Sequence, residues 1–236
     1  MIRKMIVPLL FLAVMCSFAS AETRIVEPEG VYAEIDTRSS MQAIKTLQAG
    51  TDKEKAEMAA AVESKAGDYC PAVFFSLAAY LFDTGKTDDA LFWLYAGRIR
   101  TLYDIKRCTD GTAGAGYEAL NMSVPESLKL MQFENMENTK KIVEKAIRWD
   151  KETPANYDPR WIALHGMGAY IGVADDNKKE PSLTIPEKEW KDLAEKNRKE
   201  YWDAFQEDIK SITPEQLGEI RARIKSLKQE AAAAKK

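Results

Sequence analysis

His165 is the only histidine of the chain, which makes it the first candidate for acid or base chemistry near neutral pH. A catalytic histidine needs a second group within hydrogen-bonding distance, and the flanking sequence, with Gly166 and Gly168, places none beside it. Those glycines do not follow a strand and lack the spacing of a phosphate-binding loop. We therefore interpret His165 as a packing residue that also belongs to a candidate binding surface.

Cys70 and Cys108 are the two cysteines outside the N-terminal leader described below. An even pair of cysteines in an exported protein is more often a disulfide than a metal site or a nucleophile. In the chain-entropy model, a disulfide that closes a loop of this length adds roughly 3 to 4 kcal/mol of stability. The sequence thus predicts a Cys70–Cys108 disulfide, with a nucleophilic cysteine paired to His165 as the alternative.

Several acidic residues could in principle bind calcium or act as catalytic carboxylates, but their spacing in the sequence does not match such sites. Residues 175–177 read Asp-Asp-Asn and offer oxygen atoms that suit calcium, yet the regular spacing and distal glutamate of a helix-loop-helix calcium site are absent. Glu54 with Glu57, and Glu134 with Glu137, would each share a helix face, as glycosidase carboxylates sometimes do. Exposed helices carry such pairs routinely. The sequence predicts no catalytic residue, no metal ligand and no cofactor.

Basic and aromatic residues gather in the middle of the chain. Arg98, Arg100, Lys106 and Arg107 form the strongest local positive patch; a helix C-terminus stabilises such cations without a ligand, and an acidic partner surface is the alternative. Seven aromatic residues lie between positions 74 and 95, so some of them are expected to line a groove, although core packing is the default. The candidate binding surface comprises Phe75, Trp93, Arg98, Arg100, His165 and Tyr170.

The first 21 residues have the pattern of a cleavable export signal. Two basic residues precede an apolar run from Met5 to Met15, and small residues at 19–21 form a cleavage site that ends at Ala21. Lipid attachment at Cys16 is the alternative, and the bulky residue before it disfavours this reading. We expect a periplasmic or secreted protein after cleavage near Ala21.

The charge of the chain argues against a nucleic-acid partner, and its hydropathy argues against a membrane-spanning segment. The formal net charge is −3 and becomes more negative without the basic leader, so electrostatics do not favour a nucleic-acid partner. The apolar runs near Phe74 and Leu91 are much shorter than the about 20 residues of a membrane-spanning helix. We therefore expect no transmembrane segment after signal cleavage.

Helix signals recur along the chain, whereas strand signals are scarce. Ser76 is the only polar residue between positions 72 and 82, which predicts a core helix covered on several sides. Gly85 then suits the positive φ that ends a helix, and a second helix follows through Ile99. Four Ser/Thr-x-x-Glu/Gln pairs predict further helix starts: Thr51 with Glu54, Ser123 with Glu126, Thr184 with Glu187, and Thr213 with Gln216.

The hairpin at 72–100 resembles a tetratricopeptide or Sel1-like repeat over about one repeat unit. Such repeats have small or apolar residues where two helices cross, a glycine near the turn and an alanine early in the second helix. The residues at matching offsets are Ala78, Leu81, Gly85, Ala90, Leu94 and Gly97. No second copy of the pattern occurs in the chain, so the resemblance implies a repeat-like helical bundle and not a long solenoid.

The sequence as a whole predicts a mainly α protein, a repeat-like antiparallel helical bundle with a C-terminal helical hairpin or extension. A helical core at 22–152 is followed by an irregular segment at 153–186, rich in aromatic residues, glycine and proline, and by charged helices at 187–236. We expect an exported, non-enzymatic protein that binds another protein or a peptide in the cell envelope, as an immunity or adaptor factor. The alternatives are an envelope hydrolase acting on cell-wall glycan and a structural envelope component.

Overall fold

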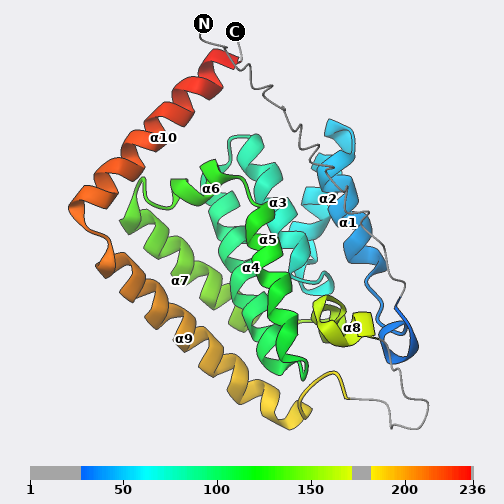
Figure 1. Ribbon diagram of the computed structural model, residues 1–236. Coiled ribbons are helices and arrows are strands. Elements are labelled where there is room, and N and C mark those ends of the chain that lie inside the picture. The colour runs from blue at the N-terminus through cyan, green and yellow to red at the C-terminus, as the bar shows by residue number, and fades with distance from the viewer. Residues whose placement is uncertain (1–27, 172–181, 235–236) are drawn as a thin grey trace, which may run out of the picture.

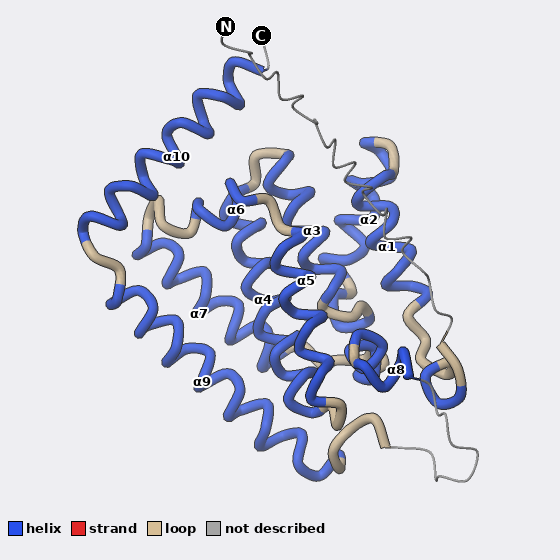
Figure 2. The backbone as a smooth tube through the Cα atoms, in the orientation of Figure 1, coloured by secondary structure: helices blue, strands red, loops and turns tan. Residues whose placement is uncertain are grey.

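The structure is a computed structural model that describes residues 28–171 and 182–234. Within these residues the regular structure is helical and contains no β-strand, which confirms the mainly α prediction (Figure 2). The leader at 1–21 and the Asp-Asp-Asn sequence at 175–177 lie outside the described residues. None of the described helices is long and apolar enough to cross a membrane.

Helices of very different length follow one another along the chain (Figure 1). The α-helices are α1 Arg38–Ala49, α2 Asp52–Ser64, α3 Ala72–Asp83, α4 Thr87–Arg107, α5 Ala115–Ser123, α6 Glu126–Met131, α7 Met136–Glu152, α8 Met167–Ile171, α9 Trp190–Ser211 and α10 Pro214–Ala234. Short 3-10 turns connect several of them: η1 Gly30–Tyr32, η2 Ala66–Asp68, η3 Gly111–Gly114, η4 Pro159–His165 and η5 Glu187–Glu189.

The helix α4 is the centre of the molecule. It packs against α3, α7 and α9 (Figure 1), and its side chains are buried almost without interruption from Ala90 to Thr101. The turn between α3 and α4 contains Gly85 at φ 83°, a conformation that side chains rarely adopt. At the crossing itself, a Cβ on Gly97 would lie 2.9 Å from a ring carbon of Phe75. Glycine at position 97 therefore allows α3 and α4 to pack closely.

Two apolar clusters hold the helices together. The larger one lies between α1, α2, α3, α4 and α7, and it contains an aromatic group in which Trp93 contacts Phe74 at 5.1 Å and Trp149 at 5.3 Å between ring centroids. The smaller one, around Tyr32, Cys70 and Trp161, joins η1 and η4 to the open end of the α3–α4 hairpin. Residues 153–171 thus cover one end of the helical core.

The helix starts follow the predicted capping pairs in two of four cases. Thr51 and Glu54 form a reciprocal capping box at α2, and Thr213 exchanges the equivalent hydrogen bonds with Gln216 at α10. Helical turns also begin at the other two places, α6 at Glu126 and η5 at Glu187, but the predicted hydroxyl caps do not form: Ser123 ends α5, and Thr184 forms an isolated β-bridge with Cys108. Proline precedes the following helical turn in both places, and its backbone conformation starts the turn without a hydroxyl cap.

The two C-terminal helices differ in how they meet the core. The helix α9 lies along α4 and α7, whereas α10 turns away after residue 212 and contacts α6 (Figure 1). Ile224 is the one side chain of α10 that is buried among those the structure describes, at 4% exposure. A groove of ≈ 640 Å³ remains between α10, α6 and the α3–α4 turn.

Candidate binding pocket between α4, α5 and α9

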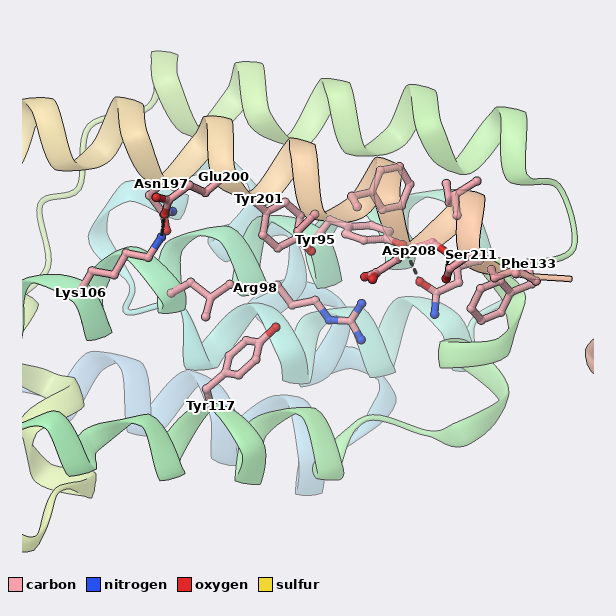
Figure 3. A pocket seen from close by; sticks show the side chains of 16 residues that line it. Tyr95, Arg98, Lys106, Tyr117, Phe133, Asn197, Glu200, Tyr201, Asp208 and Ser211 are labelled. Atoms are coloured by element: carbon pink, nitrogen blue, oxygen red, sulfur yellow. Dashed lines mark hydrogen bonds and ion pairs between the residues drawn. The ribbon is translucent and has the colours of Figure 1, made fainter. Parts of the chain in front are cut away.

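A pocket of ≈ 670 Å³ lies between α4 and α9, with α5 along its open side (Figure 3). This volume falls within the range of about 300 to 1,000 Å³ that is typical of ligand sites. Its lining combines five aromatic rings with a few charged groups: Tyr95, Arg98, Lys106, Tyr117, Phe133, Asn197, Glu200, Tyr201, Phe205 and Asp208 are the main contributors.

Arg98 reaches into the pocket from α4, and Figure 3 shows its guanidinium between the rings contributed by α4, α5 and α9. Its Nε donates a hydrogen bond of 3.0 Å to Asn121 Oδ1, and its guanidinium carbon lies 5.5 Å from the centre of the Tyr95 ring. These contacts fix the side chain. No Asp or Glu of the described residues forms an ion pair with it.

Two tyrosines and one carboxylate surround Arg98. Tyr95 donates a hydrogen bond of 2.6 Å to Gln132 Oε1, and burial raises its pKa above 10, with Arg98 lowering and Asp208 raising it. Burial likewise raises the pKa of Tyr201 well above 10, so both hydroxyls stay protonated at neutral pH. Arg98 and Asp208 both line the pocket, and Figure 3 shows the two labelled side chains in the same part of it.

The other end of the pocket is lined by an ion pair and a buried amide. Lys106 Nζ lies 2.6 Å from Glu200 Oε2, and both residues are labelled at this end in Figure 3. Asn197 is 1% exposed and donates through Nδ2 to the carbonyl of Ile99 at 2.9 Å. Its Oδ1 has no hydrogen-bond partner among the described residues. Such a buried, unpaired acceptor is rare and costly unless a donor reaches it.

The structure corrects half of the predicted binding surface. Phe75, Trp93 and Arg100 are buried, at 2%, 5% and 2% exposure, because all three lie on faces of α3 and α4 that neighbouring helices cover. Arg98 does line the pocket. His165 and Tyr170 are exposed, but they belong to η4 and α8 and do not line it.

His165 sits at the edge of the smaller cluster. Its ring lies edge-on to Trp161 at 5.7 Å, and a Cβ on Gly116 would come within 2.9 Å of it. This packing removes part of the surrounding water and lowers the pKa of His165 below its usual 6.5. The imidazole is therefore harder to protonate than that of a fully solvated histidine.

Arg100 belongs to a buried network of charges between three helices. Its Nε lies 2.9 Å from Asp150 Oδ1 on α7, and Arg198 Nη1 on α9 lies 2.9 Å from the other oxygen of the same carboxylate. The Arg100 guanidinium also hydrogen-bonds the carbonyl of Thr153 and lies 4.3 Å from the Trp149 ring. This arginine joins α4, α7 and α9 and is not available to a partner.

A second buried network centres on Asp104, which the sequence analysis did not single out. Its carboxylate accepts hydrogen bonds from Arg107 Nη2 at 2.6 Å, Trp161 Nε1 at 2.6 Å and Tyr157 Oη at 2.9 Å. Burial raises the pKa of Asp104 above its usual 3.8, while Arg107 and the two hydrogen bonds oppose that rise. Arg107 in turn lies between the rings of Tyr103 and Trp190. The network joins α4 to η4 and to the start of α9.

The cysteines differ from the prediction. Cys70 and Cys108 are both free thiols in the structure, so the predicted disulfide is not seen. The open end of the α3–α4 hairpin is held by other means. The backbone amide of Cys70 donates to Ser40 Oγ at 2.9 Å, and Cys108 forms its bridge with Thr184. The Asp104 network lies at the same end and joins α4 to η4.

Cys70 is a buried free thiol and Cys108 a half-buried one, and their reactivity can be predicted. Burial raises the pKa of Cys70 to about 11 and that of Cys108 above its usual 9.0. The thiolate is the reactive form, so both cysteines should react slowly with a thiol reagent at pH 7 and faster as the pH rises toward these values. In the chain without residues 1–21, which include Cys16, addition of urea should then release two reactive thiols without a reductant. Release of none in urea, and of two only after reduction, would show that the disulfide forms.

The pocket between α4 and α9 thus has the size of a ligand site, and its lining presents a fixed cation, a carboxylate and aromatic walls. No protein-family model matches this chain, and no curated protein or solved structure matches it either.

Proposed function

We propose that this chain is an exported, periplasmic helical protein that binds another protein through a peptide segment held in the pocket between α4, α5 and α9. The leader pattern at 1–21 supports the location. The pocket supports the binding role, because its aromatic walls and its few convergent polar groups are the usual composition of a recognition site. An immunity factor and an envelope adaptor are the two forms of this function, and the partner's identity separates them.

The observation that carries the proposal is the fixed and unneutralised guanidinium of Arg98 among aromatic rings. Aromatic residues and arginine are enriched where protein partners bind most strongly. An arginine that only stabilised the fold would be paired as Arg100 and Arg107 are paired, each with a buried carboxylate. Arg98 differs from both in that its charge remains available to a ligand.

Site-specific photo-cross-linking tests the proposal. We expect p-benzoylphenylalanine at Ala204, an exposed alanine of the pocket, to give one cross-linked product in native envelope extract. The same group at Ala119, an exposed alanine of α5 outside the pocket lining, is the matched control and should give none. The Arg98→Gln substitution should reduce the product at position 204 by about tenfold, the loss of one charge-assisted contact. Equal products at both positions, or none at 204, would contradict the proposal.

A further inference from the structure

The charges near Tyr95 indicate what kind of group the pocket accepts. Arginine presents its donors in a planar fork that matches the two oxygens of a carboxylate. The Nε of Arg98 already donates to Asn121, and the Tyr201 hydroxyl lies beside the guanidinium, so the remaining N–H groups of the terminal nitrogens are the donors open to a ligand. The pocket therefore suits an anionic group that is planar and has two oxygens.

Asp208 adds a second requirement. It lines the same pocket from α9, one α-helical turn beyond Ala204, and Figure 3 shows it on the same side of the pocket as Arg98. No ion pair joins the two side chains. A ligand that satisfies both must carry a carboxylate and a nearby N–H donor. The last residue of a peptide has this arrangement, because its amide nitrogen and its carboxylate are attached to the same α-carbon. In an aspartate or glutamate residue, the backbone N–H lies one or two bonds further from the side-chain carboxylate, so the spacing of the two groups differs.

We infer that the pocket binds the C-terminal residue of a partner protein, with its carboxylate on Arg98 and its amide N–H on Asp208. The side chain of that residue packs among the rings of Tyr95, Tyr201 and Phe205, which line the same stretch of the pocket. This inference rests on the proposed function and names the part of the partner that is recognised.

Asn197 indicates where the peptide residues that precede the C-terminal residue would lie. It lines the pocket at the end occupied by Lys106 and Glu200, away from Asp208 (Figure 3). Its unpaired Oδ1 is almost fully covered, at 1% residue exposure, and an upstream N–H of the bound peptide would satisfy it where peptide binding displaces the neighbouring side chains. A volume of ≈ 670 Å³ has room for such a peptide segment, whereas a single small anion would fill only a small part of it.

Two peptide pools that differ in one group test the inference. The full chain is immobilised and incubated with equal amounts of two pools of N-acetylated random hexapeptides. One pool ends in a free carboxylate, and the other has the same sequences but ends in a carboxamide. Retained peptides are quantified by mass spectrometry. We expect the free-acid form to be retained about tenfold or more over the amide, as a charge-assisted pair requires. The Arg98→Gln variant should lose this preference, and the exposed Arg148→Gln control on α7 should keep it.

The outcomes separate the inference from the proposed function. Equal retention of both pools, lost in a Tyr201→Ala variant, would show that peptides bind in the pocket without carboxylate recognition; the inference then fails and the proposed function stands. Retention of amidated peptides enriched in Asp or Glu would assign Arg98 to a side-chain carboxylate and also overturn the inference. Retention of neither pool would overturn it as well, and the cross-link at position 204 would decide the proposed function independently.

Discussion

Replacement of Asp104 by alanine is expected to lower the free energy of unfolding by about 3 to 5 kcal/mol, the cost of leaving a buried charge without its partner. Asp104 is 0% exposed and Arg107 is 3% exposed, so water cannot replace the lost carboxylate. The hydroxyl of Tyr157 and the indole N–H of Trp161 would lose their acceptor at the same time. Since domains are typically stable by about 5 to 15 kcal/mol, this single change removes a large share.

Urea unfolding at pH 7, followed by circular dichroism, measures the effect. Asp203→Ala is the matched control, because Asp203 forms an exposed ion pair with Lys199 on α9. Exposed pairs are worth about 0 to 1 kcal/mol, so the control should change little. If Asp104→Ala lost no more stability than Asp203→Ala, the Asp104 network would not hold η4 and α9 to α4.

Replacement of Trp93 by alanine is the second change with a large expected effect, about 3 to 5 kcal/mol of lost stability. Trp93 contacts Phe74, Phe92 and Trp149 within 5.1 to 5.3 Å between ring centroids, and the surrounding helices cannot close the space that the indole would leave. For a chain of this size, the midpoint of thermal unfolding should fall by on the order of 10 °C.

Thermal unfolding followed by circular dichroism at 222 nm tests this expectation. Together with a binding assay, it also decides whether Trp93 acts in the core or on the binding surface. Met122→Ala is the control, because Met122 is 77% exposed on α5 and should change the stability by about 0.5 kcal/mol or less. If the Trp93→Ala protein kept its stability but lost partner binding, Trp93 would belong to the binding surface, as the sequence predicted.

The sequence predicted those parts of the fold that local interactions determine. The helices α3 and α4, with Gly85 between them, follow from the apolar run and from the positive φ that the turn requires. The capping box at α2 needs only Thr51 and Glu54, three positions apart in the sequence. The resemblance of this hairpin to a tetratricopeptide or Sel1-like repeat stays a prediction.

Parts of the site that depend on distant segments could not be predicted in this way. Arg98 and Arg100 are two positions apart on the same helix, yet one faces the pocket and the other meets Asp150 in the interior. Nothing near either residue in the sequence distinguishes them, because the difference comes from α7 and α9. Asp104 and Arg107, three positions apart in a helix that is apolar on most sides, did carry a local signal for a buried pair.

The pocket exists only when two distant parts of the chain are both present and packed together. It is assembled from α4, near the middle of the chain, and from α9, which begins at Trp190 and is synthesised near the end. Chains are made from the N-terminus and can begin to fold before they are finished. A nascent chain that has formed the α3–α4 hairpin still lacks one wall of the pocket. A partner that recognises this pocket therefore engages chains that contain α9 and ignores chains truncated before it.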